Sequence, residues 1–124
     1  MAGQNPAETV NQLMGAINRG DVESAVALYE PEATLVAEPG KPVRGRTAIR
    51  AALEGFIALK PTLTGETHQV IEGGDVALFS SKWSLKGATP DGKPVHMGGI
   101  SSDVLRRQAD GTWLIVIDNP WGTG

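Results

Sequence analysis

Two aspartates stand in a predicted hairpin among residues of types that are usually buried. The segment GGISSDVLRRQADGTWLIVIDNPWG, residues 98–122, contains two strand-like runs joined at Ala109-Asp110-Gly111, and Asp103 and Asp118 lie one in each run. Side chains alternate between the two faces of a strand, so pairing across the turn places both aspartates on one inner face. The same face would hold Gly99, Ser101, Leu105, Val116 and Pro120.

Two carboxyl groups held close together in a poorly solvated site do not both ionise readily, and this separates an acid role from a base role. The spacing therefore predicts that Asp103 and Asp118 form an acid–base pair in a pocket. The alternative is structural: either aspartate faces solvent or pairs with Arg106, Arg107 or Lys82. A β-bulge near the hairpin would also change which face Asp118 occupies.

The elements that would position these residues follow from the apolar spacing. Helical spacing begins at Val10 and continues to a stop at Gly20, with Asn5 as the predicted cap. Asp21 is predicted to cap a second, shorter helix that ends before Pro31, and a strand over 33–38 then dissolves into a Gly and Pro loop. A third helix is predicted from about 47 to 59.

After Pro61 the apolar period changes to two, which predicts a meander of four antiparallel strands. Its first turn is Gly73-Gly74-Asp75, its second is ATPDGKP, and its third is Ala109-Asp110-Gly111. Helices early and strands late predict a single α+β domain over residues 1–124, with three helices on one face of a curved sheet.

Small residues inside these strands predict a cavity under the helices, because serine and glycine do not fill such a space. They are Ser80, Ser81, Ser84, Gly98, Gly99, Ser101 and Ser102. Trp83 should face inward on its strand, and two interpretations stay open for it: core filling, or a wall for a flat apolar ligand. Trp113 is predicted to pack on the outside or at an interface. The predicted ligand contacts are Trp83, Ser101, Phe79, Leu13, Phe56, Val116 and His96.

No metal or other cofactor is predicted. The chain has no cysteine, which excludes disulfides, iron–sulfur clusters and thiolate zinc sites. Its two histidines, His68 and His96, lie on different predicted strands with no carboxylate at metal-ligand spacing. A bulge at Met97-Gly98-Gly99 would turn His96 toward the pocket mouth as a candidate general base, whereas a hydrogen-bonded or exposed ring is the alternative.

The order of these elements resembles the NTF2-like superfamily, in particular its ketosteroid-isomerase-like and SnoaL-like branch of small bacterial proteins. The resemblance rests on GDVESAVALYEPEATLV, on VRGRTAI and on SSDVLRRQADGTWLIVIDNP, in this order and spacing. It implies a curved antiparallel sheet with the three N-terminal helices on its concave face. It also places Trp121 where the pocket opens, to cover it or to cross to a partner subunit.

In ketosteroid isomerases a carboxylate moves a proton while a tyrosine and a protonated aspartic acid donate hydrogen bonds to the enolate. The resemblance places Asp103 at the aspartic acid and Leu13 at the tyrosine. Tyr29, the only tyrosine, ends the second helix that the apolar spacing predicts. The resemblance places the base at the end of the first strand, where Glu38 and Ala37 compete for the inward position. Steroid isomerisation is therefore not expected, and neither is epoxide hydrolysis by an Asp, Arg, Asp set, because Ser101 and Leu105 flank Asp103 on its face.

The resulting prediction is a protein that binds a small organic molecule in an apolar pocket, with metal-free isomerase- or cyclase-like chemistry at Asp103, Asp118 and Glu38 if it is an enzyme. The rival is an interaction module with a vestigial cavity. Both include a homodimer through the outer sheet face, formed by Val76, Leu78, Ile100, Val104, Leu114 and Ile117. A formal charge of −3 without a basic run predicts no nucleic-acid partner, and the lack of a long apolar run predicts a soluble, cytoplasmic protein.

Overall fold

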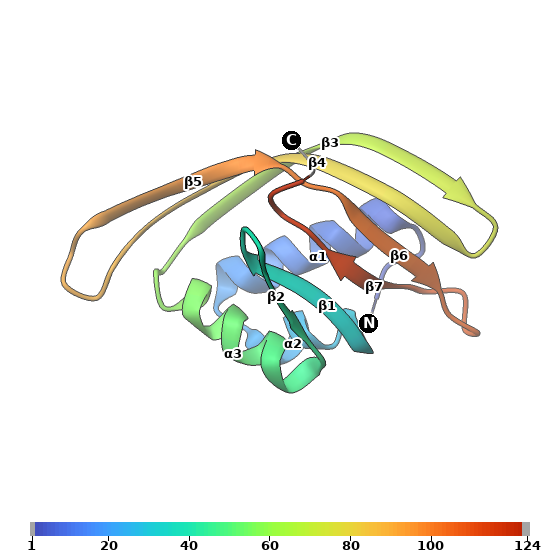
Figure 1. The fold of residues 1–124 in the computed structure, drawn as a ribbon, viewed down its shortest axis with the longest axis horizontal. Coiled ribbons are helices and arrows are strands. Elements are labelled where there is room, and N and C mark those ends of the chain that lie inside the picture. Colours follow the sequence, from blue (N-terminus) through green and yellow to red (C-terminus); the bar gives the residue numbers. More distant parts are fainter. Residues whose placement is uncertain (1, 123–124) are drawn as a thin grey trace.

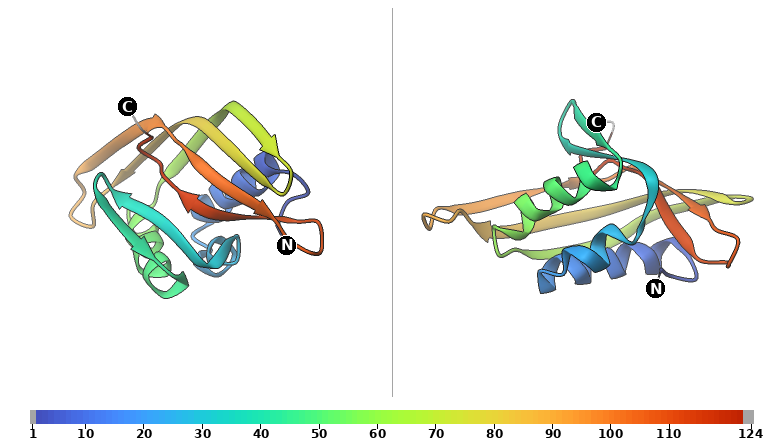
Figure 2. Two further views of the ribbon diagram at one scale, coloured as in Figure 1. Left: turned by 45° about the vertical axis from the view of Figure 1, so that its right-hand side comes forward. Right: turned by 90° about the horizontal axis from the view of Figure 1, so that it is seen from below.

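The computed structural model describes residues 2–122. Three helices and a seven-stranded sheet make up the fold, and the sheet curves around the helices (Figures 1 and 2). The helices are α1 (Pro6–Arg19), α2 (Val22–Val26) and α3 (Arg46–Ile57). The strands are β1 (Tyr29–Glu38), β2 (Lys41–Arg44), β3 (Thr62–Gly73), β4 (Val76–Ala88), β5 (Pro94–Ile100), β6 (Asp103–Arg107) and β7 (Trp113–Asp118).

The first helix begins and ends where the sequence predicts, and the second begins there but ends at Val26, earlier than predicted. Asn5 Oδ1 accepts a hydrogen bond from the Glu8 amide at 2.9 Å, and Gly20 adopts the left-handed conformation that ends α1. Asp21 caps α2 by accepting from the Ser24 amide at 3.1 Å. The side chain of Asn18 then fixes α1 against the sheet, because it both donates to and accepts from the backbone of Leu63 at 2.9 and 2.7 Å.

The sheet has the order β2-β1-β7-β6-β4-β3, and β5 pairs with β4 beside β6. Its neighbouring strands are antiparallel except β1 and β7, which run parallel. The α+β prediction is confirmed, with two differences in the strands. The loop predicted after Glu38 forms the short strand β2, and the third strand of the predicted meander is broken at Ser101 and Ser102 into β5 and β6.

The hydrophobic core lies between the concave face of the sheet and the helices. Its most deeply buried side chains include Tyr29, Leu35, Ile49, Leu105 and Ile115. Trp113, predicted to lie outside or at an interface, is only 3% exposed and belongs to this core. Its amide donates to the carbonyl of Gly3, and its own carbonyl accepts from the buried hydroxyl of Thr9 at 2.8 Å, so the segment before α1 covers it.

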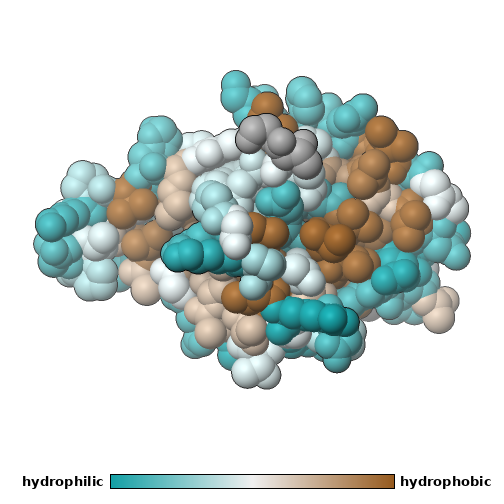
Figure 3. All heavy atoms as spheres, viewed as in Figure 1, coloured by the Kyte–Doolittle hydropathy of each residue, from teal (hydrophilic) through white to brown (hydrophobic). Residues whose placement is uncertain are grey.

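The outer face of the sheet carries an apolar patch. Its exposed large side chains are Ile71, Val76, Leu78, Ile100 and Ile117, whereas Val70 pairs with the inward-facing Phe79. Apolar side chains group on the part of the surface seen at the right of Figure 3. Val104 and Leu114, which the prediction adds to this face, are partly buried.

Candidate active site

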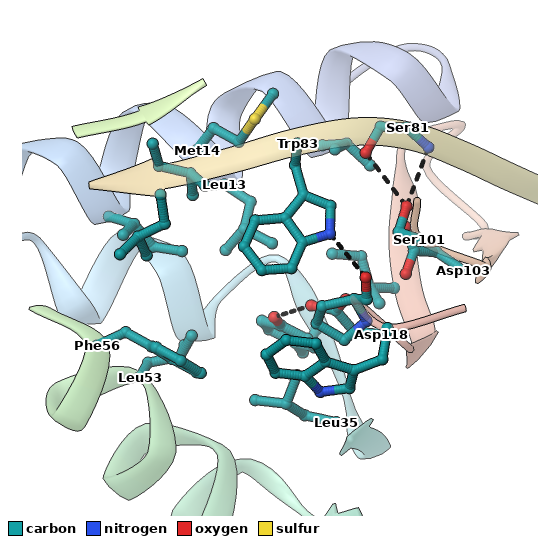
Figure 4. A pocket seen from close by; sticks show the side chains of 18 residues that line it. Leu13, Met14, Leu35, Leu53, Phe56, Ser81, Trp83, Ser101, Asp103 and Asp118 are labelled. Atoms are coloured by element: carbon teal, nitrogen blue, oxygen red, sulfur yellow. Dashed lines mark hydrogen bonds between the residues drawn. The ribbon is translucent and has the colours of Figure 1, made fainter. Parts of the chain in front are cut away.

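A cavity of about 100 Å³ lies between α1, α3 and the inner face of the sheet (Figure 4). Most of its wall is apolar, with Leu13 and Met14 from α1, Leu53 and Phe56 from α3, and Leu35 from β1. The polar groups come from the strands and from the residues that follow β5. They are Tyr29, Ser81, Ser101, Asp103 and Asp118. No lysine, arginine or histidine within residues 2–122 lines the cavity.

The two aspartates of the last hairpin meet at the wall of this cavity. Asp103 is the first residue of β6 and is 6% exposed, and Asp118 is the last residue of β7 and is partly accessible. The phenol of Tyr29 donates to Asp118 Oδ2 at 2.5 Å, and the amide of Asn119 donates to Asp103 Oδ1 at 2.9 Å. The structure thus brings together the two carboxyl groups that the strand pattern predicted to be neighbours.

Burial raises the pKa values of both carboxyl groups, and their mutual proximity separates the two. The pKa of Asp103 lies well above its ordinary value, first because burial disfavours the charge and then because Asp118 adds a like charge and a hydrogen bond. The hydroxyl of Ser101 and the amide of Asn119 oppose that shift in part. Burial also raises the pKa of Asp118, while hydrogen bonds from Tyr29 and Asp103 favour its ionised form. We assign the proton to Asp103 and the negative charge to Asp118.

A β-bulge places Asp118 on the cavity side. The pairs of β6 and β7 are Val104 with Ile117 and Leu105 with Ile115. One step along β6 thus corresponds to two along β7, and the extra residue is Val116. Ile115 and Asp118 consequently both line the cavity although they are three residues apart. The prediction of Val116 as a ligand contact is wrong. The bulge interrupts the alternation of side chains along β7, and Val116 does not line the cavity.

Sequence reasoning missed Tyr29. It is the first residue of β1, not the end of the second helix, and its side chain is fully buried. The guanidinium of Arg46, at the start of α3, donates to its backbone carbonyl. Burial and the charge of Asp118 raise the pKa of the Tyr29 phenol well above its ordinary value, so the phenol stays a donor. The signal that could have found it is the strand-type run YEPEATLV, which extends the first strand back to this residue.

Four other predicted residues lie at the cavity. Leu13, Phe56, Trp83 and Ser101 all line it, and the Trp83 ring reaches into it from β4 (Figure 4). Trp121, expected at the pocket opening, also lines the cavity, with its ring 5.5 Å from that of Trp83 at an angle of 68°. Trp83 therefore serves as a cavity wall.

Three predicted residues lie elsewhere. Glu38 is exposed on the β1–β2 hairpin, 3.3 Å from Lys41, because its strand continues outward beyond the cavity. His96 is exposed on β5 and contacts the hydroxyl of Ser84 at 3.2 Å, so no bulge turns it inward. Phe79 is buried at 2% exposure but lines a second cavity, which Asp103 also borders. These positions correct the expectation that all three reach the main pocket.

Within residues 2–122, no three His, Cys, Asp or Glu side chains group as a metal site. Over the same residues, no helix is both long and apolar enough to cross a membrane.

Several solved structures share this fold. An NTF2-like superfamily protein from Salmonella enterica has a TM-score of 0.77 at 22% identity, covering 93% of this chain and 88% of that one. A candidate ketosteroid isomerase from Shewanella frigidimarina has a TM-score of 0.76 at 26% identity, covering 94% and 95%. A candidate calcium/calmodulin-dependent protein kinase II association domain from Xanthomonas campestris has a TM-score of 0.77 at 19% identity, covering 94% and 84%.

These likenesses show that the chain has the NTF2-like fold. A model of the SnoaL-like domain matches residues 10–116, and the protein belongs to that family. No curated protein matches the sequence significantly.

Proposed function

We propose that the protein binds a small, mostly apolar organic molecule in this cavity and that the Asp103–Asp118 pair exchanges a proton with it. The observation that carries the proposal is the pair of carboxyl groups on a mostly apolar wall, one buried and one partly accessible, with Tyr29 donating a hydrogen bond to Asp118. Pairs of titratable groups whose surroundings separate their pKa values are a recurrent basis of acid–base catalysis.

The arrangement gives each aspartate a different role. Asp118 carries the charge and accepts from Tyr29, which makes it the base, whereas Asp103 keeps its proton and acts as the acid. A carbon acid bound against Asp118 would lose its proton there, and Asp103 would donate a hydrogen bond or a proton to the oxygen that becomes negative. The name of the Shewanella protein, a candidate ketosteroid isomerase, supports chemistry of this kind.

The size of the cavity limits the ligand. Its volume of about 100 Å³ is below the several hundred that a drug-sized pocket offers. An engineered cavity of about 150 Å³ holds benzene. We infer a ligand whose buried part is about one ring in size, so a steroid-sized molecule is not favoured.

Binding is tested with benzyl alcohol as the probe, because the three tryptophans provide an internal control. Trp83 and Trp121 line the cavity and Trp113 does not. In a proton–nitrogen correlation spectrum, the indole N–H signals of Trp83 and Trp121 should shift as benzyl alcohol is added, and that of Trp113 should stay in place. An unchanged spectrum, or an equal shift of all three signals, contradicts a ligand site in this cavity.

Proton transfer is tested with 5-nitrobenzisoxazole. A base takes its carbon-bound proton, the electron pair completes a nitrile, the N–O bond breaks, and a coloured phenolate leaves. Asp118→Asn should slow this elimination at pH 8 by at least about 100-fold, the low end for a positioned base. Glu66→Gln, which removes an exposed carboxylate, should leave the rate unchanged. Equal rates in the wild type and Asp118→Asn would remove Asp118 as a base.

A second function has its own observation, the apolar patch on the outer face of the sheet. We propose that two copies associate through this face, which the name of the Xanthomonas association domain supports. Light scattering at tens of micromolar should give a dimer, and Leu78→Lys, at the most exposed residue of the patch, should give a monomer. A monomeric wild type would contradict association.

A further inference from the structure

We propose that the cavity selects a small organic ammonium, a ring-sized apolar body carrying a primary amine, over neutral molecules of the same shape and against carboxylates. This inference rests on the proposed function, because it takes the cavity as the ligand site. It follows from what the wall offers to a charged group: acceptors and aromatic rings, with no cationic side chain among residues 2–122.

The aromatic donors of the wall are already engaged. The indole N–H of Trp83 donates to the carbonyl of Pro120 at 2.6 Å, and that of Trp121 donates to the carbonyl of Val36 at 2.9 Å. The phenol of Tyr29 donates to Asp118. A carboxylate in the cavity would thus displace an existing hydrogen bond to gain a donor, which leaves a buried acceptor without a partner.

The serine hydroxyls add acceptor capacity rather than a site for an anion. Ser101 Oγ accepts from the amide of Ser81 at 3.0 Å and lies 3.1 Å from Ser81 Oγ. The amide of Asn119, beside them, already donates to Asp103. An incoming ammonium, which has three donors and no acceptor, matches what remains: the carboxyl oxygens and the serine oxygens.

The aromatic walls also favour a cation. Trp83 and Trp121 meet edge to face, and Phe56 lines the cavity from α3. Because both indole N–H groups are held by backbone carbonyls, the rings are fixed and cannot turn to present a donor. A cation near an aromatic face is attracted by the ring, and the attraction grows as water is excluded.

The charge of the Asp103–Asp118 pair also favours an ammonium ligand. Asp103, Asp118 and Tyr29 are the titratable groups of the described residues that face the cavity. An ammonium would supply the missing counter-charge, and the proton held between the two carboxyl groups would leave to solvent when they pair with it. Ammonium binding should thus tighten as pH rises from 6 to 8, whereas binding of a neutral alcohol should not.

Three molecules of nearly the same shape test the inference: benzylamine, benzyl alcohol and benzoate. With the indole signals of Trp83 and Trp121 as readout and Trp113 as internal control, benzylamine should bind at pH 8 at least tenfold more tightly than benzyl alcohol. Benzoate should bind at least tenfold more weakly than the alcohol. Titration in 0.15 and 0.5 M salt removes attraction by the net surface charge, which salt screens.

Two variants separate the cavity charge from the overall charge. In Asp103→Asn/Asp118→Asn the affinities for amine and alcohol should come within threefold of each other, whereas Glu66→Gln should keep the wild-type preference. If the double variant does not fold, the order of the three affinities in the wild type decides alone. Alcohol bound as tightly as amine overturns the charge selection and leaves the cavity as a ligand site. No binding of any of the three overturns both proposals.

Discussion

Replacing Asp103 with asparagine tests whether this aspartate is held at a cost to stability. Its folded pKa is raised, so the native state holds the proton more tightly than the unfolded chain does. The favourable contribution is present below the unfolded pKa and is lost as pH rises through the folded pKa. Asparagine does not ionise, so Asp103→Asn does not lose stability in this way. The free energy of unfolding of the variant, relative to that of the wild type, should therefore increase from pH 5 to pH 8.

The size of the gain follows from the contacts that asparagine keeps. Its side-chain oxygen still accepts from the Asn119 amide, and its amide group can donate to ionised Asp118 in place of the shared proton. No packing volume is lost, since the two side chains have the same shape. A buried polar group that is imperfectly paired costs about 1 to 3 kcal/mol, so a gain of this order is expected at pH 8.

Urea unfolding followed by tryptophan fluorescence at pH 5, 6.5 and 8 measures the difference, at constant ionic strength. Glu66→Gln controls for the change in net charge, because it removes one exposed carboxylate outside the cavity. A variant that is less stable than wild type at pH 8 would refute the reasoning. It would show that Asp103 stabilises the fold as an ionised acceptor, and the acid role assigned to it would have to be abandoned.

Three further substitutions test the surroundings of the pair. Tyr29→Phe removes the hydrogen-bond donor that favours ionised Asp118, so the pKa of that carboxyl should rise. The pH profile of 5-nitrobenzisoxazole elimination should then move to higher pH. A profile that does not move would contradict the role of the phenol. Thr9→Val should cost about 1 to 3 kcal/mol in urea unfolding, because it leaves the Gly3 amide without its acceptor, and a variant of wild-type stability would show that this amide finds another partner. Gly87→Ala should lower the thermal midpoint, because a Cβ there would lie 2.6 Å from the backbone oxygen of Leu59, just after α3. An unchanged midpoint would show that this segment can move.

The parts of the fold that the sequence predicts are those governed by local rules. Asn5, Gly20 and Asp21 define helix ends through hydrogen bonds or backbone angles within a few residues, and these ends were predicted. The break at Ser101 and Ser102 and the strand β2 depend on pairing between distant segments. No spacing along the chain specifies them, so β5 and β6 were taken as one strand.

The same distinction applies to the site. Alternation along a strand correctly brought Asp103 and Asp118 together, although the extra residue at Val116 means that their shared face depends on a bulge. Tyr29 was missed because its partner Asp118 is 89 residues away. Glu38 was misplaced because only the hairpin with β2 shows that the end of β1 leaves the cavity.

The bulge in β7 links the fold to the chemistry. With regular alternation Ile117 would follow Ile115 into the core, and Asp118 would face the outside of the sheet, where solvent would stabilise its charge. The extra residue instead turns Ile117 out, to 41% exposure, and Asp118 in, toward Tyr29. One inserted residue therefore does two things: it adds an apolar side chain to the outer patch, and it buries a carboxyl group next to Asp103. The proposed association face and the proposed acid–base pair thus depend on the same irregularity, and deletion of Val116 should disturb both.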